Sequence, residues 1–215
     1  MKDRRGEDLL NTLVKIWANF VIFSKSIDRA FDYLNRYYLR NSNLPLVGHR
    51  CLQIFKEEVF NPLKQHITKA LMEQITKDRN GEQISKEIVQ KSIAIFVDIG
   101  LVLPKPMRTR DGTFLWQGDR NLQVYDEEFE ECFLDATLKE SSQKATLWNS
   151  TRNCPEYLQE IKGFLENEEL NADYWLQPET KLKMLKIVEK EMITHMAESI
   201  ASKESGVVYM LSQKN

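Results

Sequence analysis

The chain has 215 residues, of which 42% are hydrophobic and 29% are charged, and its formal net charge is -2. This composition is typical of a globular protein with one or two domains and excludes disordered, collagen-like and low-complexity chains. Because basic residues are not in excess and no apolar run reaches the roughly 18 residues that cross a bilayer, we expect no nucleic-acid partner and no membrane partner.

Residues 7–40 contain no glycine or proline, and their apolar residues recur with the spacing of a helix. This pattern predicts one or two helices with a buried stripe. The residues of the stripe are Leu13, Ile16, Trp17, Phe20, Phe23, Ile27, Phe31, Leu34 and Tyr38. Leu44-Pro45 ends the pattern, since proline cannot continue a helix.

Two helices are expected between Leu52 and Gly81. The first carries apolar residues from Leu52 to Val59. Asn61 and Pro62 predict the start of the second, because asparagine caps free backbone N–H groups and proline suits the first helical position. Gly81 predicts its end.

Ser85 is expected to cap a further helix, which Gly100 ends. Residues 101–124 then lose the helical period and contain two prolines and two glycines. We interpret them as a long loop with a short hairpin at residues 113–116.

Three later helices are expected to begin at Asp126, at Cys154-Pro155 and at Gln177-Pro178. Residues 205–210 indicate one more helix start. The whole pattern is all-α. Long helices with short breaks favour stacked helical units over a four-helix bundle, although periodicity alone does not separate the two.

No catalytic or metal-binding motif is present, and the three histidines and three cysteines are widely spaced. We therefore expect free thiols in a reducing compartment, no catalytic residue, no metal and no cofactor. The acidic run at residues 126–131 and the lysines at 181, 183, 186 and 190 are interpreted as solvated helix faces.

A second stripe lies beside the apolar one before residue 40. Arg29, Tyr33, Arg36, Tyr37 and Arg40 share one face of a helix. Tyrosine and arginine are enriched at the energetic centres of protein interfaces. Two interpretations stay open: the stripe binds a partner, or its tyrosines complete the packing between helical repeats.

Several blocks of the sequence resemble the cullin family, in the family's own order. The blocks are FDYLNRYYL, Leu44-Pro45 with Gly48 and CLQIFKEEVF, TKDRNGEQISKEIVQKSIAIFVDIGL, VYDEEFEECFLDATLKESSQKATLW, CPEYLQEIKGFLENEE, YWL and KEMITHM. Together they cover nearly the whole chain and resemble the N-terminal repeat region of a cullin, most closely a plant-like cullin of the SCF class. The resemblance implies a fragment or truncated form.

The resemblance implies an elongated, α-solenoid-like stack of five-helix cullin repeats. Residues 1–42 would be the C-terminal helices of a first repeat. Residues 43–176 would form a complete second repeat, with residues 101–124 as a loop longer than the family's. Residues 177–215 would open a third repeat.

The resemblance also implies a non-catalytic scaffold of a cullin–RING E3 ubiquitin ligase, in the cytoplasm and nucleus. Such a scaffold is a rigid spacer between the substrate adaptor and the RING/E2 module, and acts by positioning. Its partners would be a BTB/POZ-fold, Skp-type adaptor with F-box receptors and, through a C-terminal region that the blocks do not include, a RING-box protein. The expected adaptor contacts are Arg29, Tyr33, Asn35, Arg36 and Tyr37.

Two other functions remain open. The chain could be a truncated cullin-like decoy, or an unrelated helical-repeat protein such as a subunit of a tethering complex.

Overall fold

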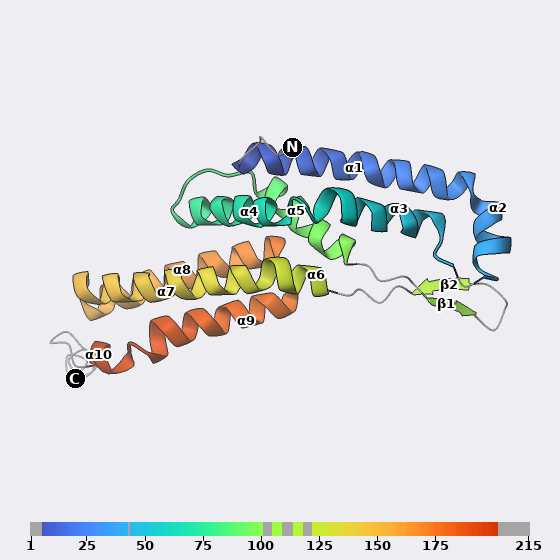
Figure 1. The fold of residues 1–215 in the computed structure, drawn as a ribbon. Helices are drawn as coiled ribbons and strands as arrows, with labels where there is room; N and C mark the ends of the chain where they lie inside the picture. Colours follow the sequence, from blue (N-terminus) through green and yellow to red (C-terminus); the bar gives the residue numbers. More distant parts are fainter. Residues whose placement is uncertain (1–5, 43, 101–104, 109–113, 118–121, 202–215) are drawn as a thin grey trace. The chain divides into compact units, whose positions relative to one another are not determined.

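The structure is a computed structural model that describes residues 6–42, 44–100, 105–108, 114–117 and 122–201 (Figure 1). The elements in this part of the chain are α1 (Gly6–Ala30), α2 (Asp32–Leu34), the π-helical turn η1 (Asn35–Leu39), α3 (Val47–Phe55), η2 (Lys56–Phe60), α4 (Lys64–Arg79), α5 (Lys86–Ile99), β1 (Lys105–Arg108), β2 (Phe114–Gln117), α6 (Gln123–Tyr125), η3 (Asp126–Glu130), α7 (Glu131–Thr151), α8 (Cys154–Trp175), α9 (Pro178–Glu189), η4 (Lys190–Thr194) and α10 (Ala197–Ala201). Helices dominate, so the all-α prediction is confirmed. No helix among the described residues is long and apolar enough to cross a membrane.

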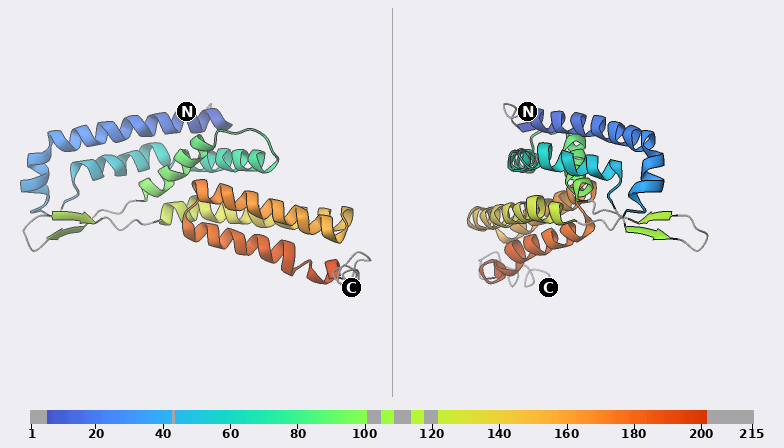
Figure 2. Two further views of the ribbon diagram at one scale, coloured as in Figure 1. Left: turned by 180° about the vertical axis from the view of Figure 1, so that it is seen from behind. Right: turned by 45° about the vertical axis from the view of Figure 1, so that its right-hand side comes forward.

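The chain divides into two compact units, residues 1–129 and residues 130–215. In the first unit, α1 contacts α3, α4 and α5. Figures 1 and 2 show α1 lying along α3 and reaching α2 at the end far from the N-terminus. Leu9, Leu10 and Leu13 of α1 are buried, which fixes the first half of this helix in the core.

An aromatic cluster forms the centre of the first unit. Phe96 of α5 meets Phe60 of η2 edge-on, with ring centroids 5.1 Å apart, and lies 6.0 Å from Phe129 of η3. Tyr125 of α6 lies 5.3 Å from Phe129. All four side chains are fully buried. This cluster therefore joins three segments that are far apart in the sequence.

The predicted buried stripe of residues 13–38 is only half correct. Trp17 and Phe20 pack against Phe55 of α3, at centroid distances of 5.2 and 4.5 Å. Beyond them the stripe is exposed: Phe23 is 57% accessible, and Phe31, Leu34 and Tyr38 are also exposed. The period of a sequence identifies an apolar face, but burial needs a second element, and among the described residues none covers this end of the stripe.

The predicted helix limits are correct where the signal is local. Gly81 ends α4 with a φ of +80°, a conformation that glycine adopts without strain. Ser85 precedes α5 in an extended conformation, as predicted, although its side chain makes no capping hydrogen bond. The Asn61 prediction is wrong. Asn61 is itself helical and follows η2, while α4 begins after Leu63.

The segment after Gly100 contains a hairpin, but its limits differ from the predicted residues 113–116, because residues 114–117 form only one of its two strands. Strands β1 and β2 pair antiparallel, with Lys105 opposite Gln117 and Arg108 opposite Phe114. The rest of the predicted loop, up to residue 121, lies outside the described residues. The next helix begins at Gln123 and not at Asp126, because the turns α6 and η3 precede α7.

The second unit consists of α7, α8, α9 and the turns that follow (Figure 1). The predicted starts of α8 and α9 are confirmed. Asn153 and Glu156 form a reciprocal capping box at the start of α8, and Gln177 precedes Pro178 at the start of α9. The helix start predicted at residues 205–210 lies outside the described residues.

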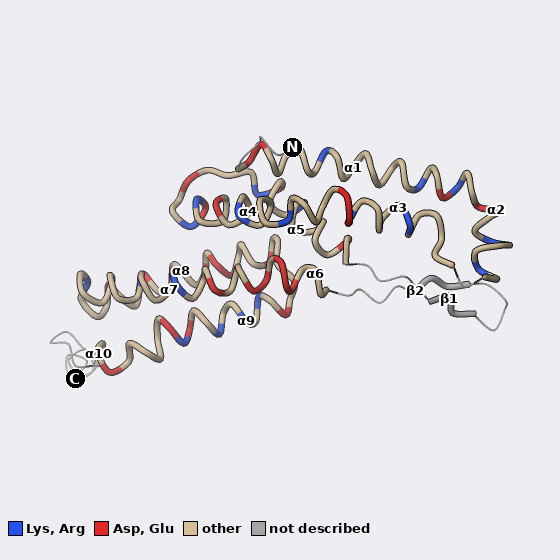
Figure 3. The backbone as a smooth tube through the Cα atoms, in the orientation of Figure 1, with Lys and Arg blue, Asp and Glu red and all other residues tan. Residues whose placement is uncertain are grey.

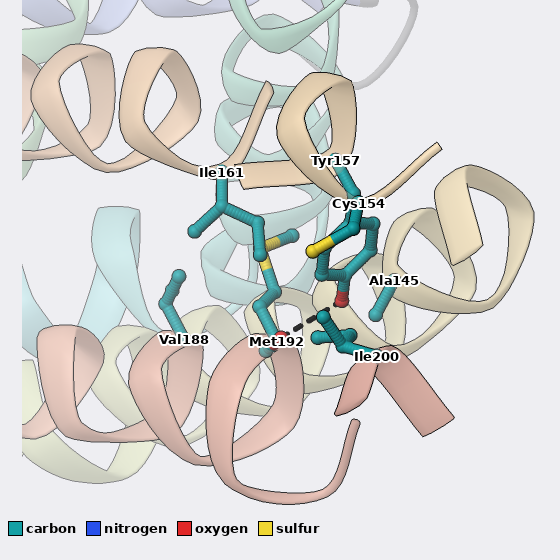
Figure 4. Packing of buried hydrophobic residues seen from close by; sticks show 7 residues of the cluster. All are labelled: Ala145, Cys154, Tyr157, Ile161, Val188, Met192 and Ile200. Carbon is teal, nitrogen blue, oxygen red and sulfur yellow. Dashed lines mark hydrogen bonds between the residues drawn. The ribbon is translucent and has the colours of Figure 1, made fainter. Parts of the chain in front are cut away.

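Figure 4 shows the core of the second unit, which consists of Ala145, Cys154, Tyr157, Ile161, Val188, Met192 and Ile200. The Tyr157 hydroxyl donates a hydrogen bond of 2.8 Å to the backbone carbonyl of Met192. Burial raises the pKa of Tyr157, so this side chain stays neutral and can keep donating. This single hydrogen bond, among apolar neighbours, therefore connects α8 to η4 across the core.

The acidic run at residues 126–131 and the lysines of α9 and η4 are solvated only in part. Glu130 is 5% exposed and accepts hydrogen bonds from Thr180, at 2.7 Å, and from Lys183, at 2.6 Å. Lys181 lies 2.6 Å from Asp173, and the hydrogen bond to this carboxylate, with that to Glu169, raises the pKa of Lys181. The prediction of solvated faces is therefore wrong for Glu130, which is buried and whose partners lie 50 and 53 residues away in the sequence. The other charged residues of the two segments are exposed or half-buried, with Glu127, Glu131, Lys183, Lys186 and Lys190 exposed as predicted.

Candidate partner-binding site

An aromatic pair forms the most exposed part of the predicted second stripe. Tyr33 of α2 and Tyr37 of η1 are 77% and 60% exposed, and their ring centroids lie 4.6 Å apart. Tyrosines four positions apart meet on one helix face, where each ring restricts the motion of the other. These two large amphipathic side chains would therefore lose little conformational entropy when a partner binds them.

Arg29 and Arg36 lie on the same segment of the chain as this aromatic pair. The Nε of Arg36 lies 2.9 Å from Oδ1 and 2.8 Å from Oδ2 of Asp32, on the same helix face. Arg29 is exposed near the end of α1. Figure 3 shows charges of both signs along this end of α1 and along α2. We refer to Arg29, Tyr33, Arg36 and Tyr37 as the tyrosine–arginine surface.

Asn35 does not belong to that surface. It is 5% exposed, and its side-chain amide donates to the carboxylate of Asp28 at 2.9 Å. Its side-chain oxygen accepts from the backbone N–H of Val47 at 3.1 Å. The hydrogen-bonding groups of Asn35 therefore face the protein interior and are not accessible to a partner. The other four predicted contacts, Arg29, Tyr33, Arg36 and Tyr37, are exposed. The sequence missed this role because both partners belong to other helices.

Exposed apolar side chains occur along the second half of α1 and along α2 and η1, the same segment that carries the tyrosine–arginine surface. They are Ile22, Phe23, Phe31, Leu34 and Tyr38. Scattered exposed apolar residues need no explanation, but a group of them on one helix end, beside tyrosine and arginine, is typical of a protein-interaction site. The structure thus leaves accessible the second half of the predicted apolar stripe and the four residues of the tyrosine–arginine surface.

His49 of α3 lies near Asp28, the hydrogen-bond partner of Asn35. Burial lowers the pKa of His49, and the carboxylate of Asp28 opposes this effect in part. The folded-state pKa is below the unfolded value of 6.5, so the unfolded chain binds the proton more readily. His49 therefore stabilises the fold above its unfolded pKa, and this contribution is lost as the pH falls through the folded pKa.

The prediction is that the first unit becomes less resistant to urea between about pH 7.5 and about pH 5.5, and that His49→Gln reduces this loss. The control is His66→Gln, since His66 is exposed on α4 and its removal also deletes one imidazole. The measurement is the change in the urea midpoint between the two pH values for the unsubstituted chain, His49→Gln and His66→Gln. An equal loss in all three would show that His49 does not contribute.

The described residues contain no cluster of metal-ligating side chains. No three of their histidine, cysteine, aspartate and glutamate side chains gather so that they could hold a metal ion. A hollow of about 440 Å³ in the first unit has Lys56, Lys64 and Glu128 among its lining residues. Lys64 pairs directly with Glu128, and we assign no reaction to this hollow.

Comparison with known proteins identifies the family. Residues 1–215 match the family model described as the cullin alpha solenoid domain. The chain is 28% identical over 210 residues to Cullin-1 of Caenorhabditis elegans, covering 94% of this chain and 26% of that protein. It is 26% identical over 204 residues to Cullin-2 of Arabidopsis thaliana, covering 95% and 25%. Cullin-like protein 3 of Arabidopsis thaliana is 26% identical over 187 residues, covering 87% and 66%.

The chain therefore spans between about a quarter and two thirds of the length of these curated relatives. The match to the family model runs from the first residue to the last, and its solenoid description agrees with the all-α fold. On this evidence the chain belongs to the cullin family.

Proposed function

We propose that this chain is a non-catalytic scaffold segment of a cullin–RING E3 ubiquitin ligase, in which it acts as a rigid spacer. Membership of the cullin family supports this role, and the helical repeat fold suits it. Stacked helices bury their apolar faces on their neighbours, which makes a support that resists bending. In the intact protein the segment would hold substrate and ubiquitin donor at a fixed separation, a contribution of position rather than of chemistry.

The repeat limits are part of this proposal. Residues 1–42 would complete a first cullin repeat, residues 43–176 would form the second, and residues 177–215 would open the third. Compactness alone divides the chain elsewhere, after residue 129. The first division follows the family's repeats and the second follows compactness. The two need not coincide, since a solenoid repeat also contacts the repeats on either side of it.

The proposed partner of the tyrosine–arginine surface is a BTB/POZ-fold adaptor of the Skp type, which would carry F-box receptors. The observation that carries this proposal is the exposed, mutually packed pair of Tyr33 and Tyr37 with Arg36 beside it. Rigid aromatic rings and arginine are the side chains that supply most binding energy at protein interfaces. A RING-box protein would bind another part of the intact scaffold, and the complex would act in the cytoplasm and nucleus.

The test is binding of a purified Skp-type adaptor to the full-length gene product that contains this chain. We expect Tyr37→Ala to weaken binding by about tenfold or more, equivalent to about 1.4 kcal/mol, because truncation removes a central aromatic contact. Calorimetry with both purified proteins measures the affinity. The 215-residue chain alone is expected to bind the adaptor weakly, since the resemblance places part of the adaptor surface on an earlier helix.

Tyr174→Ala is the matched control, because Tyr174 is also an exposed tyrosine but lies on α8. It should leave adaptor affinity unchanged. Equal effects of the two substitutions, or no adaptor binding by the unsubstituted protein, would contradict the proposal. The second result would favour a tethering-type interaction protein, whereas tight binding by the 215-residue chain alone would favour a decoy.

A further inference from the structure

A partly buried polar cluster, in which Asn35 is buried and Asp28 is half-buried, lies on the inner side of the turn that carries Tyr33 and Tyr37. The side-chain amide of Asn35 donates to the carbonyl oxygen of Asp28 at 3.2 Å and to its carboxylate Oδ1 at 2.9 Å. That Oδ1 also accepts from the backbone N–H of Gly48 at 3.0 Å, and Asn35 Oδ1 accepts from the N–H of Val47 at 3.1 Å. We call these two side chains the Asp28–Asn35 latch. It joins α1, η1 and α3 at a single point.

The latch replaces the missing cap of α3. Val47 and Gly48 are the first residues of this helix, and the side chain of the preceding residue, Leu46, makes no capping hydrogen bond. The first backbone N–H groups of a helix have no partner within it. Here the side chains of Asp28 and Asn35 accept two of them, and a carboxylate at this end is also favoured by the helix dipole.

Gly48 is required by the close approach of this cluster. A Cβ at this position would lie 3.1 Å from Oδ1 and 3.2 Å from Cγ of Asp28. Such contacts are tighter than ordinary van der Waals packing, so a Cβ here would shift the Asp28 carboxylate by a few tenths of an ångström. The latch can therefore be disturbed from the α3 side without changing a residue of the tyrosine–arginine surface.

Asn35 and the two tyrosines occupy opposite sides of the same turn. Residues two positions apart on a helix point away from each other. Consistently, Asn35 is buried while Tyr33 and Tyr37, two positions before and after it, are exposed. A side chain that fixes the inner side of the turn necessarily sets the direction in which the outer side faces.

We propose that Asp28 and Asn35 are positioning residues. They hold the turn that carries Tyr33 and Tyr37 against the start of α3. The tyrosine–arginine surface is therefore presented in one orientation. This inference rests on the proposed role of that surface in adaptor binding. Because the turn is already ordered, no conformational entropy of the turn is lost when a partner binds. Loss of the latch should reduce affinity although neither residue touches the partner.

The test compares two variants that break the latch from different helices, Asn35→Ala on η1 and Gly48→Ala on α3. Each is expected to weaken binding of the purified Skp-type adaptor to the full-length gene product by about fivefold, because each frees the same turn. In the background of Tyr37→Ala, the Asn35→Ala substitution should have a smaller effect, since it acts through that tyrosine. Amide exchange at Val47 should also become faster in Asn35→Ala.

Thr68→Val is the control for a general loss of stability. Thr68 is a buried polar residue of the same unit, and its hydroxyl donates to the carbonyl of Glu128 at 2.9 Å, away from the latch. It should lower the thermal midpoint but change adaptor affinity by less than about twofold. An equal loss of affinity in this control would overturn the proposal.

The remaining outcomes separate the latch from the proposed function. An effect of Asn35→Ala without an effect of Gly48→Ala would show that Asn35 does not act through the Asp28–Asn35 latch, and would overturn its positioning role. If both variants bind normally while Tyr37→Ala binds weakly, the latch inference fails and the adaptor proposal stands. If the unsubstituted gene product binds no adaptor, both fail.

Discussion

Phe96→Ala is expected to destabilise the first unit by about 4 kcal/mol, the largest effect of any substitution considered. Phe96 is completely buried, and its ring contacts Phe60 edge-on and Phe129 at a tilt. Its removal costs the transfer energy of the ring, leaves a cavity, and breaks two aromatic contacts between segments of the chain. Because a domain is stable by only about 5–15 kcal/mol, this loss would leave the unit marginally folded.

Native-state hydrogen exchange of the α5 amides is the appropriate measurement, since it reports the opening of the first unit by itself. Phe23→Ala is the matched control, because it also removes a phenylalanine ring, from a side chain that is 57% exposed. That change should cost less than about 0.5 kcal/mol. A small effect of Phe96→Ala would show that the aromatic cluster does not hold the unit together.

The helices could be predicted because their signals are local. Gly81 and Pro178 act through backbone geometry that does not depend on the rest of the chain, and both helix limits are confirmed. The helix start assigned to Asn61 failed because the preceding turn η2 continues into it. A cap residue can act only where the backbone is free to become extended, and the sequence does not show this.

Burial was predicted less well than helicity. The apolar period of residues 13–38 is real, but Phe23 and Tyr38 are exposed, while Leu13 at the other end is buried. A period indicates which side of a helix is apolar and not what covers it. For the same reason the exposure of Tyr33 and Tyr37 could be proposed from sequence but not decided.

Polar contacts between helices were not predictable at all. Asn35 looks like another member of an exposed polar stripe until Val47 and Gly48 are brought next to it. The acidic run at residues 126–131 contains one buried carboxylate, Glu130. Its partners, Thr180 and Lys183, lie 50 and 53 residues later in the sequence. Residue type and spacing describe one helix at a time, whereas these roles depend on which helices meet.

Glu130→Ala is expected to destabilise the second unit by about 2–3 kcal/mol. Glu130 lies just before α7 and contacts the first two turns of α9, where the buried Thr180 donates at 2.7 Å and Lys183 donates at 2.6 Å. Removing the carboxylate takes an acceptor from a hydroxyl that is almost completely buried and separates an ion pair. The loss stays below the cost of breaking a fully buried pair, because Lys183 is half exposed and can return to water.

Two further variants identify which contact matters. Glu131→Ala removes the neighbouring carboxylate, which is exposed, and should cost less than about 0.5 kcal/mol. Glu130→Gln keeps an acceptor for Thr180 but removes the charge that faces Lys183, so its cost should fall between those of the two alanine variants. Amide exchange in α9 measures all three. If Glu130→Gln is as harmful as Glu130→Ala, the charge holds α9 in place, and if it is harmless, the hydrogen bond to Thr180 does.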